Sequence, residues 1–379
     1  MKILMLVANS ITTDPRSYNE AQALIKDGHR LTIIGWDREK QHPYRQTWDG
    51  IDVLRPRICL SPKFGLGLPP WHIFHMLIWQ WKAYRAAVNI NKESAIDAVH
   101  CHFLDTLPIG ILLKRKPGIP LVYDARDMYG YMMQASFPLW VANIIAGIEK
   151  LLVSKSDVVI AVSEVMKRFL NKMTDRPVTI IMNCKTLQSR EYIRRDKESK
   201  FTLLYIGTLH KARALPQLMH VVDELPDVQC VIGGIGQAGY IDTLRAECLK
   251  SPNISFVGKV PLDRVLPMTM EADVIFCMFD PANPNNRIGM PNKLFESMVC
   301  GRPIICTSGI YSGELTDKEQ IGMAVEYTEE ALKQAIIKLR DNPDLRERLG
   351  RNALRAAVTK YNWENEGKKL QQLYRDIQI

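Results

Sequence analysis

The stretch RIGMPNKLFESMVCGRPII, residues 287–305, combines polar side chains that could do chemistry with an apolar remainder. Its centre has the pattern of a short helix. At 100° per residue, Asn292, Lys293 and Glu296 share one face of this helix, while the large apolar residues share the other. Two interpretations of the polar face are open. Lys293 and Glu296 could form a solvated i,i+3 pair, or the three side chains could bind a polar ligand.

Three further loops combine glycine with basic residues, and each follows an apolar segment typical of a strand. They supply Gly207, Lys211 and Arg213 in IGTLHKARAL, Gly234 in IGGIGQAG, and Gly258, Lys259 and Val260 in FVGKVP. Glycine lets a phosphate approach the backbone, and basic side chains neutralise its charge. Each loop alone is weak support, since no complete G-x-G-x-x-G fingerprint is present. Four loops at the carboxyl edge of one parallel sheet nevertheless favour a site for an anionic ligand.

The first half of the chain carries two histidines near the end of a predicted strand. In VHCHF, His100 and His102 are two residues apart and therefore share one face of that strand. Two histidines without a third ligand are thin support for a metal site, and we predict none. The plain alternative is a pair of satisfied histidines at a strand end.

The segment NSITTDPRSYNE places Asp14 and Arg16 before a predicted helix. Arg16 could meet an anionic acceptor substrate, with Asp14 beside it. Asp14-Pro15 is also an ordinary way to begin a helix. Both interpretations stay open.

Short apolar strands alternate with helical segments from the first residue onward, a pattern that predicts parallel sheets with right-handed crossovers. The predicted strands are 2–8, 30–36, 95–103, 120–126, 157–163 and 178–183, then 201–207, 227–234, 254–258, 273–279 and 302–308. The fold class is therefore α/β, with two doubly wound Rossmann-like halves and a cleft between them. The predicted domains are 1–188 and 201–357, joined by a polar linker, 189–200. A C-terminal helix, 358–379, is expected to cross back to the first domain.

Composition describes an ordinary folded protein of 379 residues with a net charge of +9, which favours anionic partners. The eight cysteines form no C-x-x-C pair and are expected to be buried free thiols in a reducing compartment. The apolar run at the N-terminus is too short to span a membrane and lacks a cleavage site, so we expect a cytoplasmic protein. The basic residues are dispersed without a recognition motif, which argues against nucleic acid.

Residues 68–89, LPPWHIFHMLIWQWKAYRAAVN, contain three tryptophans. The polar residues His75, Lys82, Arg85 and Asn89 fall on one stripe of a predicted helix. The apolar remainder is wider than one packed helix face requires. The helix could contact the inner face of a membrane peripherally, or it could be a core helix of the first domain.

The segment PNKLFESMVCGRPII resembles the signature of the family-4 retaining glycosyltransferases, which have the GT-B fold. YIGTLHKARAL, the GGIG turn, ISFVGKVP and the ending YNWENEGKKLQQLY extend the resemblance over most of the chain. It implies that Glu296 binds the ribose hydroxyls of a nucleotide sugar, while Lys293 and Arg213 neutralise the departing diphosphate. It places Gly234 near the nucleotide and the backbone around 258–260 against the base.

The resemblance extends to the first half of the chain. It implies that His102 donates a hydrogen bond to the transferred sugar. YDARDMY matches a loop of the family in which Asp124 and Asp127 would orient the acceptor or the sugar, although Asp127 could equally cap the next helix. The chain departs from the common pattern at Ile288, where the first signature glutamate is missing. It also has Thr208 in place of an arginine, which shifts the phosphate role toward Lys211 and Arg213.

The resemblance predicts transfer of a sugar, with retention of configuration, from a nucleotide diphosphate sugar to a saccharide or lipid-linked acceptor. A UDP-sugar is favoured as donor and a GDP-sugar comes next, with no metal and no cofactor. Two alternatives stay open: a sugar-nucleotide 2-epimerase, and a non-catalytic subunit that binds a sugar nucleotide. A nicotinamide-dependent dehydrogenase is disfavoured, because the dinucleotide fingerprint is missing after the first strand.

Overall fold

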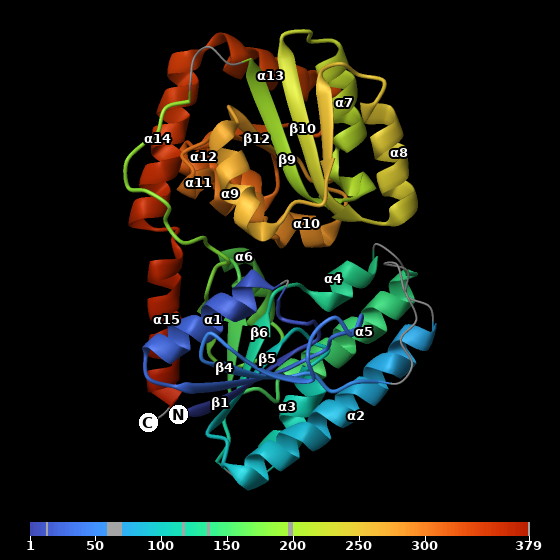
Figure 1. Ribbon diagram of the computed structural model, residues 1–379, viewed down its shortest axis with the longest axis vertical. Coiled ribbons are helices and arrows are strands. Elements are labelled where there is room, and N and C mark those ends of the chain that lie inside the picture. The colour runs from blue at the N-terminus through green and yellow to red at the C-terminus, as the bar shows by residue number, and fades with distance from the viewer. Residues whose placement is uncertain (13, 59–69, 116–117, 135–136, 196–199, 378–379) are drawn as a thin grey trace. The chain divides into compact units, whose positions relative to one another are not determined.

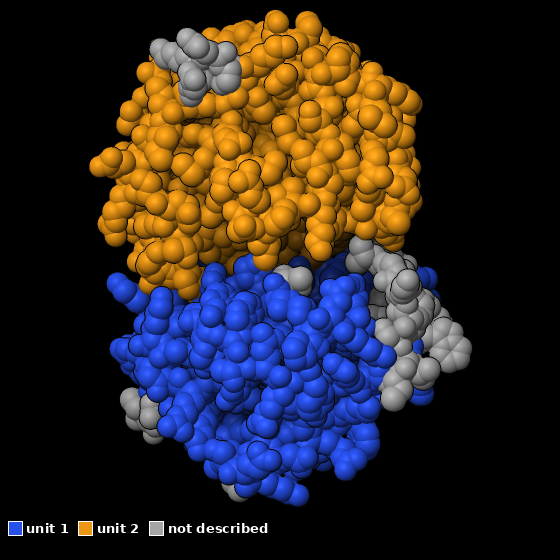
Figure 2. Space-filling view, in the orientation of Figure 1, with its two compact units in different colours: residues 1–182, 366–379 blue, residues 183–365 orange. Residues whose placement is uncertain are grey.

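A computed structural model describes residues 1–12, 14–58, 70–115, 118–134, 137–195 and 200–377, without the side chains of residues 70–73. The chain forms two compact units (Figure 2). Unit 1 comprises residues 1–182 and 366–379, and unit 2 comprises residues 183–365. Residues within each unit contact one another far more than they contact residues of the other unit. The predicted domain boundaries, 1–188 and 201–357 with a linker at 189–200, stay a prediction.

Unit 1 is built on an eight-stranded sheet with the order β3-β4-β2-β1-β5-β6-β7-β8 (Figure 1). Its strands are β1 (Lys2–Val7), β2 (Arg30–Gly35), β3 (Arg45–Trp48), β4 (Ile51–Leu54), β5 (Ala98–His102), β6 (Leu121–Ala125), β7 (Val158–Ala161) and β8 (Val178–Ile180). Every pairing is parallel except that of β3 with β4. The predicted strands of this half are confirmed, whereas the β3–β4 hairpin was not predicted because its strands are only four residues long.

The helices of unit 1 connect these strands. They are α1 (Pro15–Lys26), α2 (Pro70–Glu93), α3 (Leu107–Lys114), α4 (Tyr129–Gln134), α5 (Leu139–Val153), α6 (Glu164–Leu170) and, from Glu366 onward, α15 (Trp363–Ile377). The end of α15 is tied to the sheet and to α1. The Tyr374 hydroxyl lies 2.9 Å from His100 Nδ1, and Gln371 donates to the Ala23 carbonyl.

Helix α2 contains most of the segment for which we weighed a core and a membrane position; residues 68 and 69 lie outside the described chain. One face is core: Trp79 is fully buried, stacks on Trp36 and donates to the Gly35 carbonyl. His75 is also buried, so the predicted polar stripe is wrong at that residue. On the opposite face, Phe74, Leu77 and Trp81 are more than half exposed. The core prediction is therefore confirmed for one face, and the other face is apolar and open.

Unit 2 has a six-stranded, fully parallel sheet with the order β11-β10-β9-β12-β13-β14. The strands are β9 (Phe201–Leu209), β10 (Val228–Gly236), β11 (Ile254–Gly258), β12 (Val274–Cys277), β13 (Ile304–Thr307) and β14 (Gly322–Val325). The helices are α7 (Leu215–Asp223), α8 (Ala238–Cys248), α9 (Leu262–Glu271), α10 (Pro284–Ile288), α11 (Asn292–Val299), α12 (Tyr311–Glu319), α13 (Glu329–Asp341) and α14 (Pro343–Thr359), with a 3₁₀ turn, η1, at Lys211–Arg213. The predicted strands of this half are confirmed as well.

Two further expectations concern cysteines and membranes. All seven cysteines in the described chain are buried free thiols, as predicted; Cys59 lies outside it. Among the helices that the structure describes, none combines the length and the apolar character needed to cross a bilayer.

Candidate functional site

Helix α11 presents Lys293 into the body of unit 2. The Lys293 side chain is only 7% exposed, and its Nζ lies 4.2 Å from the centre of the Tyr205 ring. Nζ also faces the Gly207 backbone so closely that a methyl group on Gly207 would collide with it. Within the described chain, no carboxylate and no hydrogen-bond acceptor meets this ammonium group. A buried cation without a counter-charge is costly, so this arrangement points to an anionic ligand.

Glu296 lies on the same helix but does not pair with Lys293. Its Oε1 is 3.4 Å from Lys185 Nζ, and both side chains are partly buried. Lys185 also donates to Asn292 Oδ1 at 3.3 Å, and Asn183 Nδ2 donates to the same oxygen at 2.6 Å. The solvated i,i+3 pair is therefore not what the structure shows. The Glu296 carboxylate keeps acceptor capacity for hydroxyl groups of a ligand.

Arg213 is the second cation at this edge. It lies in η1, directly after β9, and donates from NH1 to Asn286 Oδ1 at 3.0 Å. Its guanidinium stacks at 3.8 Å on the Phe279 ring and, like Lys293, meets no carboxylate among the described residues. Lys211, two residues earlier, is exposed.

Two glycines bring the loops after β9 and β10 into contact. Gly207 and Gly234 are partners in the ladder between these strands, and a Cβ on Gly234 would lie 1.7 Å from the Gly207 carbonyl oxygen. No other residue allows this approach. Gly258, at the end of β11, has φ +68°, where glycine is favoured. Lys259 next to it is exposed and Val260 is half-buried.

The thiol of Cys277, the last residue of β12, shows how these groups converge. Burial would raise its pKa, but a hydrogen bond from Cys306 and the charges of Lys293 and Arg213 lower it. Both cations therefore lie close enough to the Cys277 thiol to lower its pKa, at the carboxyl end of β12. The structure thus brings Gly207, Gly234, Lys293 and Arg213 together, and it leaves Lys211 and Lys259 on the surface.

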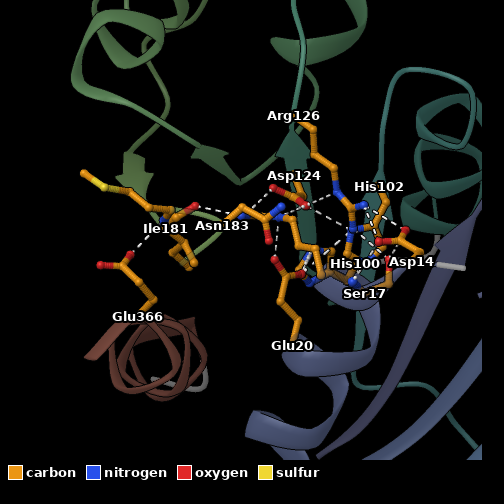
Figure 3. A network of polar contacts seen from close by, with 12 residues as sticks. Asp14, Ser17, Glu20, His100, His102, Asp124, Arg126, Ile181, Asn183 and Glu366 are labelled. Atoms are coloured by element: carbon orange, nitrogen blue, oxygen red, sulfur yellow. Dashed lines mark hydrogen bonds and ion pairs between the residues drawn. The ribbon is translucent and has the colours of Figure 1, made fainter. Parts of the chain in front are cut away.

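Unit 1 carries a buried network of charged residues at the equivalent strand ends (Figure 3). Its members are Asp14, Arg16, Ser17 and Glu20 from the start of α1, His100 and His102 from β5, and Asp124 and Arg126 from the end of β6. Asp124 is fully buried and accepts hydrogen bonds from Arg16 Nε and NH2 at 2.9 and 2.7 Å, and from Arg126 Nε at 2.9 Å. Burial would raise the pKa of Asp124, but the two guanidinium groups hold it well below its ordinary value.

Arg126 fixes the tautomer of His102. Its NH2 lies 2.7 Å from His102 Nδ1, and because a guanidinium only donates, Nδ1 accepts. Asp124 Oδ2, 3.0 Å from the same nitrogen, already accepts from Arg16 and Arg126. Burial, reinforced by the charge of Arg126, lowers the pKa of His102, so the ring is neutral. The proton is then on Nε2, which is buried and has no partner in the described chain.

Glu20 is the least expected member of the network. Its carboxylate is fully buried, and burial together with the charge of Asp124 raises its pKa to about 8. Arg16 Nε lies 2.9 Å away, but its N–H groups are directed at Asp124 and at the Ile181 carbonyl. This raised pKa favours the protonated form of Glu20 near neutral pH.

Ligand atoms of Glu20, His100, His102 and Asp124 lie within 4.8 Å of one another, close enough for a metal ion. The lone pairs of Asp124 and His102 are, however, already bound by Arg16 and Arg126. These two positive charges also oppose a cation at the same place. The residues present do not suit a metal ion.

Asp14 and Arg16, the predicted acceptor-binding residues, have structural partners in this fold, and their contact with an acceptor stays a prediction. Asp14 caps α1 by accepting from the Ser17 backbone, and it pairs with Arg126 NH1 at 2.8 Å. Arg16 is 2% exposed, and its guanidinium is bound by Asp124 and the Ile181 carbonyl. Direct contact of Arg16 with an acceptor would break these bonds, so the helix-start interpretation accounts better for both residues.

Asp127 is half-buried in the loop before α4. The amides that it could cap, those of Tyr129 and Gly130, are instead bound by Glu149 at 3.0 and 3.1 Å. Just after His102, Phe103 has φ +64°, a rarely populated conformation that is concentrated at functional sites. Asp127 and His102 thus keep their predicted roles as proposals.

Several functional residues escaped the sequence analysis. Lys185 and Asn183, which hold Glu296 and Asn292, stand far from the signature in sequence. Glu20 had one signal, its i,i+4 spacing from Arg16 on α1. Arg126 lies within the YDARDMY loop, but its position against His102 depends on the register of β5 and β6.

Sequence models of two families match the chain. The one described as Glycosyltransferase Family 4 matches residues 16–184, and the one described as Glycosyl transferases group 1 matches residues 200–342. An uncharacterized glycosyltransferase of Methanocaldococcus jannaschii is 24% identical over 242 residues, a match that spans 60% of each chain. The GDP-mannose-dependent monoacylated alpha-(1-6)-phosphatidylinositol monomannoside mannosyltransferase of Corynebacterium glutamicum is 30% identical over 165 residues, 42% of this chain and 41% of that one.

Solved structures match over the whole chain. Sucrose-phosphate synthase of Thermosynechococcus elongatus superposes with a TM-score of 0.83 at 16% identity, covering 100% of this chain and 99% of that one. HepE of Anabaena, solved in complex with UDP-glucose, gives a TM-score of 0.74 at 13% identity over 99% and 100%. At such identities the likeness shows the fold, which is GT-B. The chain belongs to the family-4 glycosyltransferases.

Proposed function

We propose that the protein is a retaining glycosyltransferase that moves a sugar from a nucleotide diphosphate sugar to a saccharide or lipid-linked acceptor, without a metal ion. The observation that carries this proposal is Lys293, a buried ammonium group that meets no counter-charge among the described residues and lies beside the close approach of Gly207 and Gly234. Fixed cations in a site poor in water stabilise the charge that develops on a departing diphosphate.

Each residue of the unit 2 site then has a task. Lys293 and Arg213 neutralise the diphosphate, and the loops at Gly207 and Gly234 let it approach the backbone. Glu296, oriented by Lys185, accepts two hydrogen bonds from the ribose hydroxyls. Gly258, Lys259 and Val260 line the base.

In unit 1, His102 supplies a neutral N–H donor for an oxygen of the transferred sugar. Its Nε2 proton has no partner in the described chain, and the bond from Arg126 to Nδ1 prevents the other tautomer. Asp124 holds Arg126 in place, and Asp127 orients the acceptor or the sugar. Arg126 to Gln should therefore lower kcat, and it should produce a mixture of tautomers in the ¹⁵N spectrum of His102. Arg168 to Gln, on exposed parts of α6, is the control.

The donor is best tested as a choice between two nucleotides. HepE was solved with UDP-glucose, which supports a UDP-sugar. The Corynebacterium relative is named as a GDP-mannose-dependent mannosyltransferase of a phosphatidylinositol monomannoside, which supports a GDP-sugar and a lipid-linked acceptor. We favour a UDP-sugar.

The first experiment is a thermal-shift panel with UDP, GDP, ADP, CMP and NAD. At 100 times its dissociation constant, a ligand adds about 2.7 kcal/mol of stability. We expect one nucleoside diphosphate to raise the melting temperature, and Glu296→Ala and Lys293→Met to lose that response. Glu271→Ala, at the exposed end of α9, should keep it. Equal responses from all variants, or none from the wild type, would contradict the proposal.

One observation favours a non-catalytic alternative. Ile288, at the position of the first signature glutamate, is apolar and only 3% exposed. A binding subunit would show the nucleotide shift without turnover. The test is release of the free nucleoside diphosphate from the sugar nucleotide in the presence of candidate acceptors. Conversion of the donor sugar without any acceptor would instead indicate a 2-epimerase.

A further inference from the structure

Helix α5 of unit 1 is amphipathic in the reverse of the usual sense. Its inward face consists of Ala142, Glu149 and Val153, which are all buried. The Glu149 carboxylate accepts hydrogen bonds from the first backbone amides of α4. The outward face carries large apolar side chains instead. Leu139 and Trp140 are each 66% exposed. An exposed apolar helix face of this kind indicates an interaction surface for a membrane or another molecule.

This outward face continues over two neighbouring helices. Helices α2, α3 and α5 lie side by side along one face of the unit 1 sheet (Figure 1). Because such a layer has a single outer side, their exposed side chains point the same way. We call them the apolar face: Phe74, Leu77 and Trp81 of α2, Leu112 of α3, and Leu139, Trp140, Ile144, Ile148 and Leu151 of α5. They are nine of the fifteen large apolar side chains exposed in the described chain.

Most of the charged side chains around the apolar face are basic. Helices α2, α3 and α5 contain only two carboxylates, Glu149, which is turned inward, and Glu93 at the very end of α2. The basic residues on these helices and just after their C-terminal ends are Lys82, Arg85, Lys92, Lys114, Arg115, Lys150 and Lys155. Lys114 is paired with Asp157, and the Arg85 guanidinium stacks on Trp81 at 4.9 Å. An apolar stripe with tryptophans and a basic border is complementary to the surface of an anionic bilayer.

We propose that the apolar face docks on an anionic lipid bilayer, with α5 lying in the plane of the interface. The sequence pattern suggested membrane contact only for residues 68–89. In the structure, most of the exposed apolar side chains of this face belong to α5. A protein partner would need an acidic rim around an apolar surface, and nothing in the chain favours one. A second copy of the chain would bring seven basic residues against seven others, which disfavours it.

Docking would place the proposed acceptor site near the lipid. Helices that connect parallel strands run antiparallel to them, so the first turns of α2 and α5 lie at the carboxyl ends of β5 and β6. Those ends carry His102 and Asp124. This step rests on the proposed function and names its acceptor class: a lipid-linked acceptor would be met at the headgroup level.

The test is co-sedimentation of the full chain with vesicles of phosphatidylcholine alone or mixed with phosphatidylglycerol. We expect binding to the mixed vesicles only, weakening as salt is raised. Ile144→Ser with Ile148→Ser should weaken binding tenfold or more, because both side chains are about half exposed and would enter the interface. Lys150→Gln with Lys155→Gln should weaken it about thirtyfold.

The matched control is Leu249→Ser with Leu262→Ser, the same kind of change at exposed positions of unit 2, which should leave vesicle binding unchanged. Equal binding of all variants, or binding to neutral vesicles alone, would overturn the proposal. So would a dimer in light scattering that Ile144→Ser with Ile148→Ser converts to a monomer, since a second copy would then cover the face. Both α5 variants should keep the nucleotide thermal shift, so failure here is distinguishable from failure of the proposed function.

Discussion

The charged sites of the two units stand at equivalent places, the carboxyl ends of parallel strands, but they are neutralised in opposite ways. In unit 1, Arg16 and Arg126 share the carboxylate of Asp124, and Arg126 also pairs with Asp14. In unit 2, Lys293 and Arg213 lie against the rings of Tyr205 and Phe279. There, no carboxylate is paired with either cation among the residues described.

This difference separates two ways of using buried charge. The network of unit 1 satisfies itself and holds His102 in one orientation and one tautomer before any substrate arrives. The site of unit 2 lacks two negative charges, which a diphosphate would supply. Substitutions of the charged residues in unit 1 should therefore lower stability, whereas substitutions of Lys293 and Arg213 in unit 2 should lower ligand binding and leave stability largely intact.

The largest effect is expected from Asp124→Asn. It leaves two buried guanidinium groups sharing a neutral amide, and breaking a buried ion pair typically costs about 3–5 kcal/mol. Urea unfolding measures the loss. Glu247→Gln, which removes the exposed partner of Lys250, is the control and should change little. A loss below about 1 kcal/mol would mean that Glu20 ionises and replaces Asp124. The double variant with Glu20→Gln would then restore the full loss.

Gly234→Ala should have the next largest effect, because unit 2 is shaped by backbone contact and not by ion pairs. The added methyl would overlap the Gly207 carbonyl oxygen and force β9 and β10 apart, at a cost of about 2–3 kcal/mol. The nucleotide shift should disappear as well. Gly239→Ala in α8 meets nothing within 4 Å and should be neutral or slightly stabilising. If Gly234→Ala and Gly239→Ala have the same free energy of unfolding, the close approach of Gly234 to Gly207 does not contribute to stability.

Glu20 gives the unit 1 network a pH dependence. Its folded pKa of about 8 lies above the ordinary value of 4.5, so between these values the folded protein binds more protons and stability falls as pH rises. Below pH 6.5 the buried His100 and His102 act oppositely, because histidines of the unfolded chain take up protons that the buried ones do not. Glu20 therefore acts alone in the network between about pH 6.5 and 8.

In that window the wild type should lose about 1 kcal/mol of stability per pH unit through Glu20, because the one-proton slope of about 1.4 kcal/mol falls to half as the pH reaches the folded pKa. Glu20→Gln, which mimics the protonated acid, should flatten the profile by that amount. The measurement is urea unfolding of both proteins at pH 6.5, 7.2 and 8, with their free energies of unfolding compared at each pH. Parallel profiles of the two proteins would show that Glu20 is ionised and paired with Arg16 throughout.

The unit 2 site was the more predictable of the two. Its residues come from contiguous motifs, each a strand followed by a loop, so the parallel-sheet rule alone brought Gly207, Gly234, Arg213 and Lys293 to one edge. Periodicity predicted the strands well because buried parallel strands are continuous apolar runs. It missed β3 and β4, which mix polar and apolar residues, and the short β14, whose residues are only partly buried.

The unit 1 network could not be predicted in the same way. It is assembled from α1, β5, β6 and α15, and its pairings depend on packing between segments up to 274 residues apart, such as His100 with Tyr374. Arg16 and Asp14 look like free polar residues of a loop until the register places Asp124 and Arg126 against them. The sequence signal for Glu149 was equally weak, since a glutamate in an otherwise apolar helix is normally on the outer face.

Lys293→Met makes the comparison sharpest, with the smallest change in stability. Methionine keeps the length of the side chain and packs favourably on the Tyr205 ring, while the uncompensated ammonium is removed. We expect the ligand-free protein to gain about 1 kcal/mol, a rise of about 2–4 °C in melting temperature, and to lose its response to the nucleoside diphosphate. Lys211→Met, on the surface of the same loop region, should change neither. A clear fall in melting temperature for Lys293→Met would show that the ammonium stabilises the fold through the Tyr205 ring, and that unit 2, like unit 1, satisfies its own charges.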